Sequence, residues 1–214
     1  MISLLTATFI VLLAPLQGGS QAKSSSQGGV ISGTVFNHEG RPVAKADVFA
    51  APARGFRAIL PHTLTDVDGK FKIAGLQPGT YFMGAEKTSE GYASNRDSFA
   101  SAGLAEVPQI VLLENQIVNG VTVRFGPKSA RLSGRIIDAR TKKSVEDAQI
   151  ILRRANNPKQ FYSTSVESKF NVLVPPLPFT VEVKASGYQD WKYSSSLTLS
   201  SGQRRGLVVS LQPK

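Results

Sequence analysis

The chain has 214 residues, 41% of them hydrophobic and 19% charged, a balance that is sufficient to bury the core of one large domain or of two smaller ones. It contains no cysteine, which excludes disulfides, thiolate metal sites and thiol nucleophiles. The formal net charge is +10, and residues 127–214 carry 15 Lys and Arg against 6 Asp and Glu, whereas residues 23–126 carry 10 against 9.

The first 22 residues have the pattern of a secretory signal peptide. From Leu4 to Leu16 the chain is apolar apart from two threonines, and a small-x-small cleavage pattern follows at Ser20-Gln21-Ala22. The apolar run is shorter than the roughly 20 residues of a membrane span. We therefore expect cleavage after Ala22, a linker over residues 23–29, and a secreted, periplasmic or cell-surface protein. An uncleaved anchor is the alternative.

Short runs with period-two alternation follow in both halves of the chain. Val121, Val123 and Phe125 alternate with polar residues, and residues 131–136 and 179–185 show the same pattern, which is typical of half-buried strands. Turn-forming residues separate the runs. Only the Ser/Ala-rich stretch at residues 95–104 is expected to hold a helical turn.

The second half of the chain repeats the first. Five segments recur in the same order: residues 31–36 as 132–137, 46–48 as 148–150, 70–73 as 169–172, 91–92 as 187–188, and 120–127 as 206–213. Five ordered matches indicate a tandem duplication. We therefore predict an all-β protein with one sandwich over residues 30–126 and a second, basic sandwich of the same type over residues 127–214.

The first copy carries a set of motifs that resembles a known family. These are SGTV at 32–35, GRPVAKADV at 40–48, TDVDGKF at 65–71, GLQPGTY at 75–81 and GY at 91–92. Together they resemble the carboxypeptidase regulatory-like domain, a transthyretin-like, seven-stranded β-sandwich. The resemblance implies two tandem Greek-key-type sandwiches, the second divergent. It also implies a non-catalytic accessory module of the kind found on exported peptidases, receptors and surface proteins; similar sandwiches bind starch or collagen.

One of these motifs begins like a calcium loop. Asp66 and Asp68 have the Asp-x-Asp-Gly spacing, but an EF-hand counted from Asp66 would place Phe71 where glycine is needed and Gln77 where a bidentate glutamate belongs. We predict a turn between two strands, with Gly69 at positive φ. Asp66 and Asp68 remain a weak candidate metal pair, and no cofactor is expected.

Catalytic patterns are sparse. Of the two histidines, His38 lies in a predicted turn and His62 in a strand or loop, and neither has a second histidine at metal-ligand spacing. No Gly-x-Ser-x-Gly elbow is present. The sequence therefore predicts no enzymatic activity. The alternative is a peptidase-associated or metal-dependent protein, whose activity would depend on Asp66 or His62.

A segment rich in aromatic and basic residues, KASGYQDWKY at 184–193, is the candidate binding patch. Aromatic faces beside cations suit sugar rings or anionic glycans. Its residues are Tyr188, Trp191, Lys192 and Tyr193, with Arg153 and Arg154 as additions from a neighbouring loop. In the alternative interpretation, Tyr188 is a packed corner residue aligned with Tyr92, and the two rings at 191 and 193 fill the core because they share a parity.

These observations predict an exported, non-catalytic accessory protein that serves in binding, adhesion or scaffolding at the cell envelope, with a carbohydrate-binding module as an alternative. Expected partners are an anionic or neutral polysaccharide, or another envelope protein, with the membrane only as a surface. A nucleic-acid role is not expected, because export removes such partners and no recognition motif is present. The excess charge has an alternative explanation as a solvated basic surface.

Overall fold

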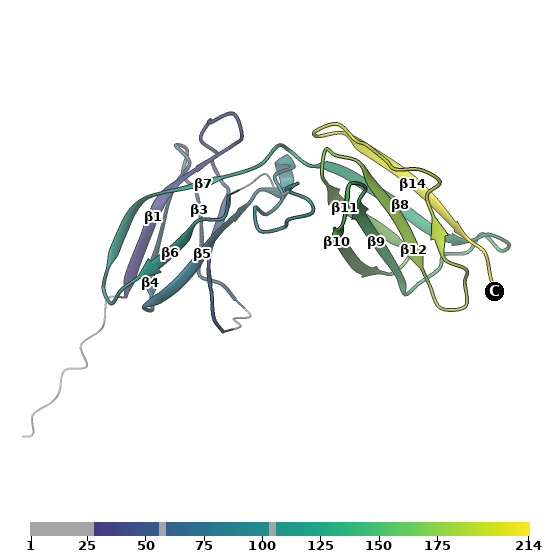
Figure 1. Ribbon diagram of the computed structural model, residues 1–214, viewed down its shortest axis with the longest axis horizontal. Helices are drawn as coiled ribbons and strands as arrows, with labels where there is room; N and C mark the ends of the chain where they lie inside the picture. Colours follow the sequence, from purple (N-terminus) through teal and green to yellow (C-terminus); the bar gives the residue numbers. More distant parts are fainter. Residues whose placement is uncertain (1–27, 56–58, 103–105) are drawn as a thin grey trace, which may run out of the picture.

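The computed structural model describes residues 28–55, 59–102 and 106–214, and the predicted signal peptide lies outside these ranges. The described residues form β-strands and a single turn of 3-10 helix, η1 (Thr88–Glu90). The strands make four sheets, which form two β-sandwiches in tandem (Figure 1). The predicted all-β tandem fold is confirmed. In the described part of the chain, no helix has the length and apolar character that a membrane crossing needs.

The first sandwich places a three-stranded sheet, in the order β4-β1-β7, against a four-stranded sheet, in the order β3-β2-β5-β6. Strands β1 and β7 pair in parallel, while the other neighbours are antiparallel. The strands are β1 (Gly29–Phe36), β2 (Asp47–Pro52), β3 (His62–Leu64), β4 (Lys70–Leu76), β5 (Gly79–Glu86), β6 (Gln109–Leu112) and β7 (Ile117–Arg124).

The second sandwich has the same topology, with sheets β11-β8-β14 and β10-β9-β12-β13 and a parallel pair of β8 and β14. Each strand takes the place of its counterpart in the first copy, so the duplication seen in the sequence extends to the strand order. The strands are β8 (Ala130–Asp138), β9 (Ala148–Arg154), β10 (Asn157–Val166), β11 (Lys169–Val174), β12 (Phe179–Lys184), β13 (Trp191–Lys192) and β14 (Arg204–Leu211).

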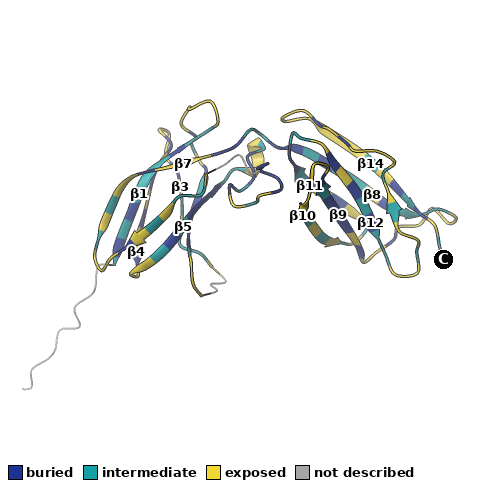
Figure 2. Cartoon of the chain, viewed as in Figure 1, coloured by how far each residue is buried: buried dark blue, intermediate teal, exposed yellow. Residues whose placement is uncertain are grey.

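Alternating side chains give each sandwich its own core. In β12, Phe179, Val181 and Val183 are buried, while Thr180 is exposed, as the period-two pattern predicts. Strands β4 and β11 show a similar alternation of buried and exposed residues (Figure 2). Full burial of each large apolar side chain contributes about 1.5–3 kcal/mol. The two cores are thus the main source of stability.

The segment that follows η1, up to residue 102, packs against the second sandwich. We call this contact between the two sandwiches the joint. The segment contains a helical turn, in which the backbone N–H of Ser101 donates to the carbonyl of Asp97 (3.0 Å), and the Asp97 side chain accepts from the N–H groups of Phe99 and Ala100. This turn directs Phe99 into the core of the second sandwich, where it is only 1% exposed. Phe99 therefore belongs to a loop of the first copy and to the core of the second.

Hydrogen bonds to backbone carbonyls reinforce this joint. The Ser129 hydroxyl donates to the carbonyl of Ala100 (2.8 Å), and the Ser129 N–H donates to the carbonyl of Gly91 (2.8 Å). Arg154 donates from Nη1 to the carbonyl of Ala102 (3.2 Å). Ser129 and Arg154 are buried at this contact, so it is a packed interface rather than a loose linker, although Arg154 Nε has no hydrogen-bond partner among the described residues.

Candidate binding site

Two aromatic residues of the candidate binding patch, Trp191 and Tyr193, lie at an edge strand and point toward the core. Trp191 pairs with Val183 in the β12/β13 ladder, and the Tyr193 N–H donates to the carbonyl of Val181. Both rings are partly buried against the second core, and their centroids lie 6.1 Å apart, edge to face. Lys192, between them, points to the outer face opposite Glu182. This arrangement agrees with the core-filling interpretation of the two rings.

Tyr188 occupies a corner of the second sandwich. Its hydroxyl donates to Asp138 Oδ2 (3.0 Å), and Asp138 Oδ1 accepts from the backbone N–H groups of Thr141 (2.7 Å) and Arg140 (2.8 Å). The backbone hydrogen bond from Thr141 is the main cause that holds the pKa of Asp138 below its usual range. Tyr92 has the corresponding place in the first sandwich. Tyr188 thus ties the end of β8 to the following corner.

The two predicted arginines are separated from these aromatic residues and from one another. Arg153 lies on the outer face of the four-stranded sheet, with its guanidinium 5.0 Å from the ring centroid of Phe161. Arg154 is 7% exposed and takes part in the joint. The structure therefore distributes the predicted set over a packed edge, a corner, an outer sheet face and the joint, and does not bring it together in one patch.

The candidate metal pair lies in a turn whose oxygens serve the backbone. Asp66 Oδ1 accepts from the N–H groups of Asp68 (3.0 Å) and Lys70 (2.8 Å), and Gly69 has φ 73°. Asp68 lies 3.8 Å from the Lys70 ammonium. The predicted turn is present. Within the described ranges, no group of three or more His, Asp or Glu side chains is placed to hold a metal ion.

His62 pairs with a carboxylate on the outer face of the first sandwich. Its Nδ1 lies 2.9 Å from Asp47 Oδ1, beside an open hollow of about 290 Å³ that Glu86 and Phe49 also line. Partial burial, and to a smaller extent the nearby Asp47, raise the pKa of Glu86. This pair is the nearest approach to an acid–base constellation that we find in the described residues.

The outer face of the β11-β8-β14 sheet carries a different and more regular arrangement. Its outward residues form three rows across the strands, because residues 131–135 of β8 each have a ladder partner on both sides. The two outer rows contain basic residues and the middle row contains small or polar ones. We call this set the cationic face: Lys169, Arg135 and Val208; Asn171, Ser133 and Gly206; Leu173, Arg131 and Arg204.

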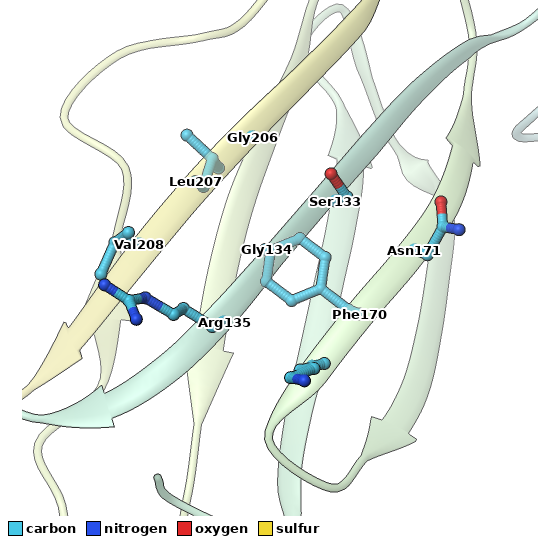
Figure 3. A pocket seen from close by; sticks show the side chains of 9 residues that line it. Ser133, Gly134, Arg135, Phe170, Asn171, Gly206, Leu207 and Val208 are labelled. Atoms are coloured by element: carbon cyan, nitrogen blue, oxygen red, sulfur yellow. The ribbon is translucent and has the colours of Figure 1, made fainter. Parts of the chain in front are cut away.

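The middle row of the cationic face and the outer row of Lys169, Arg135 and Val208 line an open hollow of about 590 Å³ (Figure 3). Gly206 contributes no side chain there, and Ser133 and Asn171 supply a hydroxyl and an amide. Below the row, the Phe170 ring packs so closely on Gly134 that a Cβ at this position would collide with it. The hollow is thus a consequence of small residues side by side on adjacent strands.

Arg131 is held in place at one end of the cationic face. Its guanidinium donates to Asn171 Oδ1 (3.2 Å) and to the carbonyl of Thr88 (3.1 Å), so it links the face to the joint. Sequence reasoning identified the alternation around Arg131 and Arg135 but not the face. A comparison of the two copies could have indicated the face, because Thr34 in the first copy aligns with Arg135 in the second.

A family model, that of the carboxypeptidase regulatory-like domain, matches residues 30–113. The match covers less than half of the chain and lies within the first sandwich. The matched range begins within β1 and ends one residue after β6, so that β7 and the whole second sandwich lie beyond it. No curated protein sequence matches the chain.

Several solved structures resemble the chain at low sequence identity. The Bacillus anthracis TIE protein is 17% identical with TM-score 0.37, over 86% of this chain and 34% of its own. A streptococcal ancillary pilin is 14% identical with TM-score 0.35, over 89% and 63%. GBS52, the minor pilin of Streptococcus agalactiae, is 11% identical with TM-score 0.35, over 86% and 96%. The chain thus spans about a third of the first protein and less than two thirds of the second, and likenesses this distant carry no functional argument.

Proposed function

We propose that this protein is an exported, non-catalytic accessory module that acts as a scaffold at the cell envelope and holds its two sandwiches at a fixed spacing. The observation that carries the proposal is the buried joint, in which Phe99 of one copy enters the core of the other. The apolar segment at residues 4–16 supports export, and the regulatory-like domain supports an accessory role.

Tandem domains move relative to one another by default, unless the interface between them is well packed and apolar. Here Phe99 makes an edge-to-face contact with Phe179, at a centroid distance of 6.4 Å, and an equally distant stacked contact with Tyr162. Arg131 and Ser129 add hydrogen bonds across the same boundary. Hinge motion would expose Phe99 and break these bonds, so the joint favours one relative orientation.

Residual dipolar couplings test the proposed rigidity. If the joint is fixed, the couplings of both sandwiches fit a single alignment tensor, and in a Phe99→Ala variant the two sandwiches acquire different tensors. Two independent tensors in the wild-type protein would refute the scaffold. Fractionation of the producing cells, with surface protease treatment, tests export and envelope location. Retention of the unprocessed protein in the cytoplasm would contradict both.

A further inference from the structure

We propose that the cationic face of the second sandwich binds an acidic polysaccharide, with sugar carboxylates against the outer rows and sugar hydroxyls over the middle row. The proposal goes beyond the scaffolding role and does not depend on a rigid joint. It assigns a ligand class to a surface that contains none of the binding residues predicted from the sequence.

The first argument is charge without internal compensation. Among the described residues, none of the four basic side chains, Arg131, Arg135, Lys169 and Arg204, forms an ion pair with a carboxylate. The opposite sheet of the same sandwich is different, because Glu182 and Asp190 pair with basic side chains of β12 and β13. Within the described part of the chain, Arg153 and Lys159 of that sheet also form no ion pair, but the cationic face gathers four unpaired basic side chains on three adjacent strands, where they attract anions.

The first sandwich supplies an internal control. It builds the same sheet with Thr34 opposite Thr122 where the second has Arg135 opposite Val208, and with Val30 opposite Ile117 where the second has the pair of arginines. Of the four basic residues, only the lysine that begins β4 or β11 is shared, and in the first copy this Lys70 lies 3.8 Å from Asp68. The first copy also has Lys72 opposite Ser32, where the second has Asn171 opposite Ser133. The fold therefore does not require the three arginines.

The second argument is the arrangement of the rows. Residues along a strand rise about 3.3 Å each, so the two basic rows lie about 13 Å apart with the neutral row between them. The first copy has a hollow at the same place, of about 270 Å³ and lined by Ser32, Gly33 and Gly120, against about 590 Å³ in the second. A polymer one sugar wide can enter such a hollow and reach the hydroxyl of Ser133 and the amide of Asn171, whereas a flat bilayer surface cannot.

The test uses the full chain and polygalacturonate as probe, with fully methyl-esterified polygalacturonate as the uncharged control. Isothermal titration at low and physiological salt compares the wild-type protein with two variants that each lose three positive charges. The face variant is Arg135→Gln/Lys169→Gln/Arg204→Gln. The control variant, Arg153→Gln/Lys159→Gln/Lys192→Gln, removes equal charge elsewhere on the same sandwich and includes two residues of the sequence-predicted patch. Circular dichroism checks that both variants fold.

We expect the wild type to bind polygalacturonate but not its ester, with affinity that falls as salt rises. Each exposed ion pair strengthens binding by a factor of roughly two to five, so the face variant should bind about 10- to 100-fold more weakly. The control variant should stay within a factor of about three of the wild type. If the face variant fails to fold, Arg135→Glu alone should still weaken binding more than Lys159→Glu.

Several results would overturn the proposal. Equal losses of affinity in the two triple variants would show an unspecific charge effect. A loss of affinity confined to the control variant would place the binding site at the patch predicted from the sequence. Absence of binding at low salt would also refute it. Tighter binding to phosphatidylglycerol vesicles than to polygalacturonate would identify a membrane surface as the partner instead. None of these outcomes affects the residual dipolar coupling experiment, so the binding proposal and the scaffold proposal can be refuted independently.

Discussion

Replacement of Phe99 by alanine should destabilise the second sandwich although the residue lies in a loop of the first. Phe99 is 1% exposed and packs against Phe179 and Tyr162, so truncation leaves a cavity in a close-packed core. Such Phe→Ala changes cost about 3–5 kcal/mol. This is a large part of the roughly 5–15 kcal/mol that stabilises a typical domain. We therefore expect the unfolding midpoint of the second sandwich to fall by more than about 10 °C.

The single tryptophan makes this effect measurable. Trp191 packs on the second core, so its fluorescence reports the unfolding of that sandwich, while calorimetry reports both. Phe161→Ala is the matched control, because this ring is 53% exposed on the same sandwich and its loss should cost no more than about 1 kcal/mol. If Phe99→Ala and Phe161→Ala lowered the unfolding midpoint equally, Phe99 would not be a core residue, and the packing of Phe99 into the second sandwich would be refuted.

Three further changes test other parts of the structure. Glu86→Gln should raise the unfolding midpoint at pH 7 and leave it unchanged below about pH 4, because burial raises the pKa of Glu86 in the folded protein and stability is lost as this group ionises. Melting curves across this pH range check the sign of the pH dependence, and an equal rise of the midpoint at every pH would exclude the charge of Glu86 as the cause. In urea titrations, Gly134→Ala should cost about 1–3 kcal/mol through collision with Phe170, whereas Gly206→Ala, where the space is open, should cost less than about 0.5 kcal/mol. Asp66→Ala should cost about 0.5–2 kcal/mol, because two backbone N–H groups lose their acceptor. A midpoint of the wild-type protein that rises with added calcium would contradict the turn interpretation.

Much of the fold could be predicted because its signals are local. Alternation along residues 179–185, the turn at Asp66 to Gly69 and the ordered repeats each involve neighbouring residues, and each reports which side of a strand faces the core. The inward parity of Trp191 and Tyr193 was visible for the same reason. A period-two pattern fixes the face of a residue without knowledge of its partners.

The joint and the cationic face were not predicted because both depend on distant residues. Phe99 stands in a Ser/Ala-rich stretch without periodicity, and nothing local indicates that its partner, Phe179, lies in the other copy. The cationic face gathers three strands far apart in the chain, and its arginine pair depends on the parallel alignment of β8 with β14. Parallel pairing of the first and last strands is a property of topology, which single-strand patterns do not encode.

That parallel pairing also determines how tension would act on the protein. Because β1 begins at one end of its sandwich and β7 finishes at the other, pulling on the two ends slides these strands along each other, as it does for β8 and β14. Sliding loads all the hydrogen bonds of the ladder together, whereas peeling would break them one at a time. Each sandwich is thus oriented to resist extension in shear, and the joint passes the load from one to the next.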